Sequence, residues 1–244
     1  MKKIKVAITG AYGHIGNVPK NNLDKNYELL LYDKIQKKGI KKVDFSNKNQ
    51  IKNLFNGIDA IIHLAADSSP EASWESVLKN NIIATKNIFE QAKLSKVKKI
   101  IFASSNHVIY TPEILTRKTK IKVKESPNPG SFYGISKLFG ENLGKYYSRE
   151  FGIKFIALRI GWTYPEDNPL VLKGTKDEDY IRAMFLSKRD CVEIFTKALE
   201  SNEKFLIANA ISNNEKAVFD LKETKEVLGC NLRDNAENYF KHNL

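Results

Sequence analysis

The sequence predicts an α/β fold in which a parallel sheet is covered by helices on both faces. Short apolar runs bounded by turn residues recur along the 244-residue chain, and amphipathic stretches of helical spacing separate them. A glycine-rich turn follows the first run directly. Strands that alternate with helices are typical of doubly wound sheets in which the strands run parallel.

Six apolar runs are expected to form the strands. In chain order they read KIKVAIT, YELLLYD, DAIIHLAA, KKIIFASS, KFIALRI and KFLIA. Between them, helical spacing is clearest over residues 75–93 and 132–150. Pro19 falls within the helix expected after the first strand. Because proline inside a helix costs about 3 kcal/mol, we expect that helix to be short or kinked.

Two long segments, 111–130 and 162–179, interrupt the alternation, and each follows a predicted strand. In open α/β sheets, the loops after the carboxyl ends of the strands line the ligand crevice. We therefore expect both segments to contact the substrate. The predicted organisation is a nucleotide-binding unit over 1–160, with a small substrate-binding lobe over 161–244 that packs on it and does not form an independent domain.

Composition and charge narrow the range of functions. Hydrophobic residues make up 42% and charged residues 28%, as in soluble proteins, and no apolar run approaches the about 18 residues that a membrane span needs. The net charge of +12 comes from lysines scattered over helix ends and loops, which disfavours nucleic-acid binding but favours the approach of a small anion. Cys191 and Cys230 lack the spacing of metal ligands, so we expect no metal and a reducing cytoplasm.

A dinucleotide site is predicted where Gly10-Ala-Tyr-Gly13-His-Ile-Gly16 follows the first strand, which makes the expected sheet Rossmann-like. Glycine lets the backbone approach a pyrophosphate, whose charge then meets the N-terminus of the next helix. Asp33 ends the second strand, near the roughly 20-residue spacing at which an acid accepts ribose hydroxyls. A carboxylate there repels a 2′-phosphate and favours NAD over NADP, although the neighbouring Lys34 would tolerate the phosphate. The alternative is that the glycines serve only the turn.

A catalytic group is predicted from Tyr133 and Lys137, which lie four residues apart and so share one face of a helix. A phenol with a pKa near 10 is a poor base, but an adjacent cation stabilises the phenolate that accepts a proton from a hydroxyl. The preceding strand ends at Ser104 and Ser105, where a hydroxyl can orient the reacting oxygen. The alternative is a surface pair of a tyrosine and a lysine without chemistry.

With the segments His63-Leu-Ala-Ala66 and Asn81-Ile-Ile-Ala-Thr, these motifs resemble the extended short-chain dehydrogenases and sugar epimerases, the NAD-dependent epimerase/dehydratase family. The resemblance implies that Ser105, Tyr133 and Lys137 are catalytic, and that Asn81 holds the geometry behind the site. It also implies that NAD is contacted by Gly10, Gly13, His14, Ile15, Gly16, Asp33, Asp44, Phe45, Leu64, Ala65, Ala66, Asn81, Tyr133, Lys137 and Ile160.

Within that family the chain is most similar to the uronate dehydrogenases, over segments 102–107, 133–143, 158–161 and 234–237. This likeness implies that Ser68, Asn106 and His107 contact the substrate. The alternatives are a helix N-cap for Ser68 and a hydrogen-bonded loop residue for His107. Trp162 departs from the pattern, since it replaces a small hydroxyl residue and narrows or changes the sugar pocket.

The likeness to the uronate dehydrogenases also implies an arginine that binds the substrate carboxylate, and this chain has only an approximate counterpart of it. Arg182 is the candidate, because a guanidinium binds a carboxylate bidentately, and Arg189 is a less favoured substitute. The alternative for Arg182 is a surface salt bridge.

The predicted function is the NAD-dependent oxidation of the anomeric hydroxyl of a monosaccharide, a sugar acid or a sugar phosphate, to a lactone. The predicted partner is thus a small, anionic sugar, and a homo-oligomer is possible. A sugar epimerase or dehydratase is the second hypothesis, and it would retain NAD without net NADH formation. The third is a non-enzymatic dinucleotide sensor, which the presence of all three predicted catalytic side chains disfavours.

Overall fold

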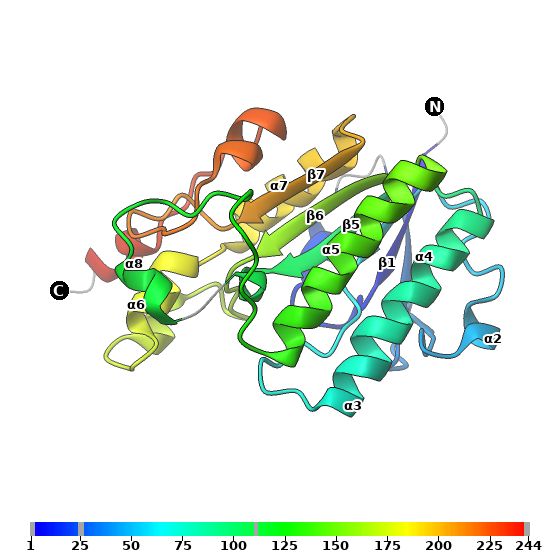
Figure 1. Cartoon of the computed structure of the whole chain (residues 1–244), viewed down its shortest axis with the longest axis horizontal. Helices are drawn as coiled ribbons and strands as arrows, with labels where there is room; N and C mark the ends of the chain where they lie inside the picture. Colours follow the sequence, from blue (N-terminus) through cyan, green and yellow to red (C-terminus); the bar gives the residue numbers. More distant parts are fainter. Residues whose placement is uncertain (1–2, 24–26, 110–111, 242–244) are drawn as a thin grey trace.

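A computed structural model describes residues 3–23, 27–109 and 112–241 of the chain. Within them lies one seven-stranded sheet in the order β3-β2-β1-β4-β5-β6-β7, and every pair of neighbours is parallel (Figure 1). The strands are β1 (Ile4–Thr9), β2 (Tyr27–Asp33), β3 (Lys41–Lys42), β4 (Ala60–His63), β5 (Lys99–Ser105), β6 (Lys154–Ile160) and β7 (Phe205–Ala210). The predicted Rossmann-like fold and its six strands are confirmed, and only the two-residue β3 was not predicted.

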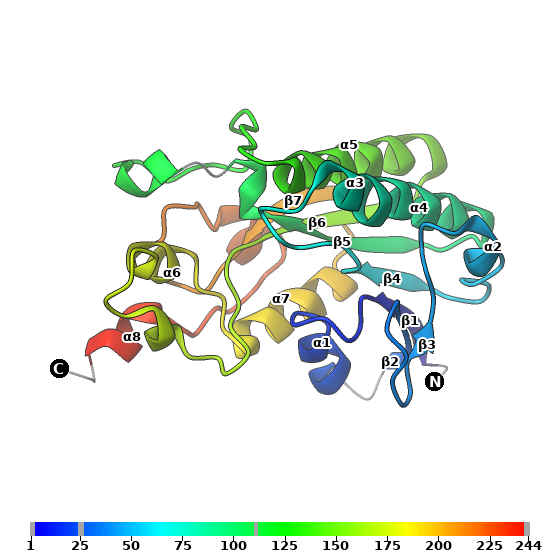
Figure 2. The same cartoon turned by 90° about the horizontal axis from the view of Figure 1, so that it is seen from below.

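Helices cover both faces of this sheet, as Figure 2 shows. One face carries α1 (Asn17–Asn22) and α7 (Lys188–Glu200). The other carries α3 (Trp74–Val77), α4 (Ala84–Leu94) and α5 (Phe132–Phe151), with α2 (Lys48–Ile51) beside α4. Because side chains alternate along a strand, Ile61 and Ile62 of β4 are both fully buried but belong to the cores of opposite faces.

Of three helices compared with the sequence, one is divided, one is as predicted and one was not predicted. The predicted helix over 75–93 is present as α3, a π-helical segment (Leu78–Ile83) and α4 in direct succession. The predicted short first helix is confirmed, since α1 has six residues. Pro19 is its third residue, and the N–H groups of the first turn have no acceptor within the helix, so proline removes no helical hydrogen bond there. Helix α7 was not predicted from the sequence. Its N-cap is Ser187, whose side chain accepts a hydrogen bond from the Asp190 N–H.

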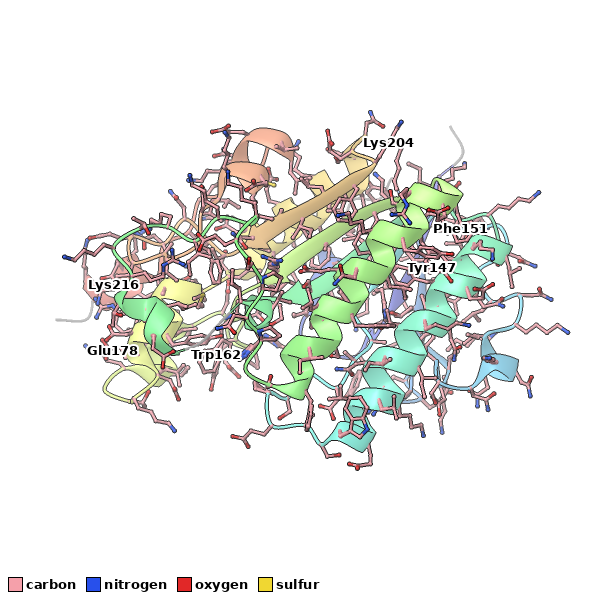
Figure 3. The ribbon with its side chains drawn as sticks, in the orientation of Figure 1. Tyr147, Phe151, Trp162, Glu178, Lys204 and Lys216 are labelled. Atoms are coloured by element: carbon pink, nitrogen blue, oxygen red, sulfur yellow. The ribbon has the colours of Figure 1, made fainter. Side chains whose placement is uncertain are left out.

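Part of the chain after β6 forms a lobe at one end of the sheet, opposite the N-terminus (Figure 1), whereas β7 and α7 of the same stretch belong to the sheet and its helical cover. Glu178 and Lys216 lie at this lobe end (Figure 3). Helices α6 (Glu178–Met184) and α8 (Ala236–Lys241) pack on each other around a small core of Ile181, Phe185, Ala236 and Phe240. The two long loops contain the short 3₁₀ turns Pro112–Thr116 and Pro169–Leu172, and Ile121 and Trp162 form isolated β-bridges with Phe219 and Phe185. Position 111 lies outside the described residues. No helix in the described ranges has the length and apolar character of a membrane span.

Two glycines bring helix α5 close to the sheet. A Cβ atom added at Gly140 would lie 2.2 Å from the ring of Phe102 on β5, and one added at Gly144 would lie 2.2 Å from the ring of Phe155 on β6. Only glycine therefore fits at these two helix positions. The helix begins at Ser131, whose Oγ accepts a hydrogen bond from the Gly134 N–H at 3.1 Å.

A buried ion pair fixes the same helix to the sheet. The Nε and Nη2 atoms of Arg159 on β6 each donate to one oxygen of Glu141 on α5, both at 2.9 Å, and both side chains are 3% exposed. The Ser104 hydroxyl donates to Glu141 Oε1 at 2.6 Å. The bidentate pairing compensates the loss of water around both charges.

We expect Gly144→Ala to lower the free energy of unfolding by up to about 2 kcal/mol. Alanine raises helix propensity by about 1 kcal/mol, but overpacking against the Phe155 ring costs about 1–3 kcal/mol. Urea denaturation measures the difference. Lys145→Ala, at the exposed next position of α5, is the control and should stay within about 0.5 kcal/mol of wild type. A Gly144→Ala protein more stable than wild type would contradict the close packing.

Candidate active site

The candidate site is a cavity of about 1150 Å³ at the carboxyl ends of the central strands. The strand order reverses between β1 and β4, which is where open α/β sheets bind their ligands. The volume slightly exceeds the range of about 300–1000 Å³ that is usual for one small molecule. The cavity therefore has room for a dinucleotide together with a small substrate.

Most residues predicted from the sequence line this cavity. Of the predicted cofactor contacts, those on its wall are Gly10, Gly13, His14, Ile15, Gly16, Asp33, Asp44, Phe45, Leu64, Ala65, Ala66, Tyr133, Lys137 and Ile160. Of the other predicted site residues, those on its wall are Ser68, Ser105, Asn106, His107 and Trp162. Asn81 and Arg182 are not among the lining residues.

The glycine turn after β1 forms a cradle that side chains would fill. Gly10 has φ +74°, and a Cβ atom there would lie 2.7 Å from the Ala65 nitrogen at the end of β4. A Cβ atom on Gly16 would lie 2.2 Å from the Gly10 carbonyl oxygen. The turn is thus as tight as a backbone that contacts a pyrophosphate must be, and it fits a dinucleotide.

Asp33 is held at the other side of this cradle. Its Oδ2 accepts a hydrogen bond from the Tyr12 N–H and its Oδ1 accepts one from the Ile35 N–H, both at 3.0 Å. A carboxylate has about four acceptor positions, so two remain for the hydroxyls of a ribose. Lys34 and Lys42 also line this part of the cavity, and Lys42 is paired with Asp33 in the sheet.

The predicted catalytic residues meet at the junction of α5 and β5. Tyr133 is 8% exposed, and its hydroxyl is hydrogen-bonded to the Ser105 side chain. Burial raises the pKa of the Tyr133 phenol, while the hydrogen bond with Ser105 lowers it. Lys137 lies one turn along α5, with Nζ 5.5 Å from the centre of the Tyr133 ring, and burial lowers the pKa of its ammonium to about 7.

Asn81 lies behind the cavity, in the π-helical segment. Its Nδ2 donates to the Ser136 hydroxyl at 2.9 Å and to the Asp67 carbonyl at 3.0 Å, and its Oδ1 accepts from the Asp67 N–H at 2.7 Å. The Ser136 hydroxyl in turn donates to the Tyr133 carbonyl at 2.7 Å. These bonds fit a positioning role, whereas the predicted direct contact with the cofactor is not supported by where Asn81 lies.

Tyr180 also lines the cavity and was not predicted from the sequence. Its hydroxyl accepts a hydrogen bond from Asn106 Nδ2 at 2.6 Å, and its ring lies 5.1 Å from the Trp162 ring, inclined by 56°. The His107 ring meets the Tyr133 ring edge-on at 5.7 Å, and burial lowers the pKa of His107. No sequence motif marks Tyr180, because its partners are 74 and 18 residues away.

The expectation that Arg182 binds a substrate carboxylate is corrected by its position. Its Nε and Nη2 donate to the two oxygens of Glu237, at 2.6 and 2.5 Å, and its Nη1 donates to Glu178 at 2.7 Å. Its guanidinium also lies 4.6 Å from the ring centre of Phe240. Arg182 therefore joins α6 to α8 and is the structural salt bridge of the alternative prediction. Arg189 is paired with Asp234 in the same lobe.

The model of the NAD dependent epimerase/dehydratase family matches residues 6–171. The chain belongs to this family. The match includes the glycine cradle, Asp33 and the group formed by Ser105, Tyr133 and Lys137. It confirms the predicted family and, with it, NAD as the cofactor. The roles of the individual site residues remain predictions.

Members of this family with similar sequences include three sugar dehydrogenases. L-arabinose 1-dehydrogenase (NAD(P)(+)) of Haloferax volcanii is 34% identical, and the match spans 95% of this chain and 97% of that protein. NAD-dependent glucose-6-phosphate dehydrogenase of the same organism is 31% identical over 96% of this chain and 95% of its own length. Uronate dehydrogenase of Pseudomonas syringae is 32% identical, and the match spans 88% of this chain and 77% of that protein.

Solved structures of the family show the same fold. A mutant of uronate dehydrogenase from Agrobacterium tumefaciens, in complex with NAD, is 28% identical and aligns over 99% of this chain and 89% of that one, with a TM-score of 0.85. This agreement confirms that the sheet and its flanking helices form a Rossmann-like unit.

We expect wild type to bind NAD at least about tenfold more tightly than NADP, a difference of about 1.4 kcal/mol, because the Asp33 carboxylate repels a 2′-phosphate. Asp33→Ser should narrow that ratio, and titration calorimetry with each dinucleotide measures it. Glu28→Gln, at the other end of β2, removes the same charge and should leave the ratio unchanged. Equal wild-type affinities for the two dinucleotides would refute the role of Asp33.

Proposed function

We propose that this chain is an NAD-dependent dehydrogenase that oxidises the anomeric hydroxyl of a monosaccharide to a lactone. The observation that carries the proposal is the contact of Tyr133 with Ser105, beside the buried Lys137. This group lies on the wall of the cavity that also contains the glycine cradle, Asn106 and Trp162. The names of the three similar dehydrogenases, which act on an aldose, a sugar phosphate and a uronate, support a sugar as the substrate.

The proposed residues each have a distinct task. Ser105 orients the anomeric hydroxyl by a hydrogen bond, and the Tyr133 phenolate accepts its proton. The ammonium of Lys137 favours the phenolate over the neutral phenol, and in the family resemblance it also contacts the nicotinamide ribose. When bound, NAD supplies the acceptor for the hydride from C1, so that the C1–O bond becomes the carbonyl of the lactone. Asp33 and the glycine cradle are proposed to hold the dinucleotide.

Two features of the sequence, Arg182 and the net charge, favour an anionic sugar. The ion pairs of Arg182 with Glu237 and Glu178 remove the first of these reasons. The proposal is therefore limited to a monosaccharide, and the charge of the sugar is argued below. A cytoplasmic location and a homo-oligomeric assembly remain predictions.

We expect Tyr133→Phe to lower kcat by about 10² or more, because it removes the proton acceptor, while NAD affinity is retained. Steady-state NADH formation and a separate binding titration measure the two effects. The matched control is Tyr146→Phe, on the exposed face of the same helix, which should leave both unchanged. Turnover of a sugar without net NADH would instead favour the epimerase hypothesis, and full activity of Tyr133→Phe would exclude the proposed base.

The rate should also depend on pH through the same phenol. Burial raises the pKa of Tyr133, so the phenolate is the minor form near neutral pH, and kcat/KM should rise as pH increases until the phenol is ionised. The phenolate and the Lys137 ammonium each stabilise the charged form of the other, so Lys137→Met, which removes the cation, should move the rise to higher pH. A profile of kcat/KM for both proteins tests this, and a flat wild-type profile would count against phenolate catalysis.

A further inference from the structure

We infer that the sugar is an uncharged aldose, bound against Trp162 and Tyr180, and that Asp177 discriminates against sugar acids and sugar phosphates. This inference rests on the proposed dehydrogenase function and deepens it. It depends on where the charged side chains of the cavity wall lie.

The cations of the cavity wall lie on its cofactor half, the part formed by the glycine cradle, Asp33 and the residues around them. Among the described lining residues there is no arginine, and the lysines are Lys34, Lys42, Lys79 and Lys137. The first two flank Asp33 at the cradle, and Lys79 lies 3.6 Å from Asp44. The fourth belongs to the catalytic group. None of these lysines is left to pair with an anionic group at the far end of a sugar.

The other half of the wall is aromatic and polar. It is formed by Ser68, Asn106, His107, Trp162, Asp177 and Tyr180. Aromatic faces suit the C–H faces of a sugar ring, and amide, hydroxyl and imidazole groups suit its hydroxyls. Burial lowers the pKa of His107, so its imidazole is neutral near pH 7 and offers a hydrogen bond but no counter-charge.

Asp177 is the charged group of this half. It caps α6 without a hydrogen bond from its own side chain to the helix, and no salt bridge with a described residue involves it. Its carboxylate is thus suited to accept hydrogen bonds from sugar hydroxyls. An anionic sugar placed there would meet a like charge, and a charge in a partly dehydrated site needs a partner.

Two arginines of the lobe already have carboxylate partners. Arg182 is paired with Glu178 and Glu237, and Arg189 is paired with Asp234. Lys188 acts on His14 electrostatically, but Glu166 and Asp167 oppose it there, and Lys188 does not line the cavity. Lys176, next to Asp177 in the sequence, is exposed and does not line the cavity. Asp177 is therefore the charged side chain that this half of the cavity wall presents to a sugar.

Two series of sugars test the inference, because within each series the ring configuration is constant and only the substituent at C5 changes. One series is L-arabinose, D-galactose and D-galacturonate. The other is D-xylose, D-glucose, D-glucuronate and D-glucose 6-phosphate. Initial rates of NADH formation give kcat/KM for each. In the series that reacts, we expect kcat/KM of the uncharged members to exceed that of the charged members by about tenfold or more.

Asp177→Asn keeps the shape of the side chain and removes its charge. We expect it to reduce the ratio of uncharged to charged kcat/KM by about tenfold, mainly through KM. Asp179→Asn removes a carboxylate two residues further on, in the first turn of the same helix. Asp179 does not line the cavity and is paired with Lys216, so this change should leave the ratio unchanged.

The outcomes separate the inference from the function on which it rests. Faster oxidation of a uronate or a sugar phosphate by wild type, or an unchanged ratio in Asp177→Asn, would overturn the inference and leave the dehydrogenase in place. A complete absence of NADH formation with all seven sugars would overturn the proposed function and the inference with it.

Discussion

The close contact between α5 and the sheet is the constraint on which the site depends. Gly140 and Gly144 bring the helix onto the rings of Phe102 and Phe155, and no larger residue fits that distance. The same helix begins with Tyr133 and Lys137 one turn apart, above the end of β5, where Ser105 lies. The separation of helix and sheet thereby sets the distance between the phenol and the serine hydroxyl.

Buried polar groups turn this packing into a defined position along the helix axis. Glu141 is bound by both Arg159 and Ser104, so α5 cannot slide over β5 and β6 without leaving a charge unpaired. Near the other end, Asn81 links Ser136 to the loop at Asp67. Because a π-helical turn contains more residues than an α-helical turn, the Asn81 amide points in a different direction than it would in a regular α-helix. The helix that carries the catalytic tyrosine is therefore fixed to the sheet through Glu141 and to the π-helical segment through Ser136.

The sequence predicts what is encoded locally. The strands are readable because each is a short apolar run, and the spacing of Tyr133 and Lys137 fixes their common face before any tertiary contact is known. Arg182 and Tyr180 are different, because their partners Glu237 and Asn106 lie 55 and 74 residues away. The pattern around Arg182 is the same whether its guanidinium faces a substrate or α8. Likewise β3 contains only two lysines, and its pairing with β2 supplies the strand character that its sequence lacks.

The net charge of the molecule and the charged side chains of the cavity act on a ligand over different distances. The excess of +12 acts on an approaching ligand as a screened field of the whole molecule, and the Debye length of about 8 Å at physiological ionic strength limits it to the surface. Binding inside a cavity is decided by side chains within a few ångströms, where the cations flank the dinucleotide cradle and Asp177 faces the remaining space. The pyrophosphate of NAD is itself an anion, so a positive surface with lysines at the cradle is explained by the cofactor alone. The surplus of lysine thus gives no reason to expect an acidic sugar.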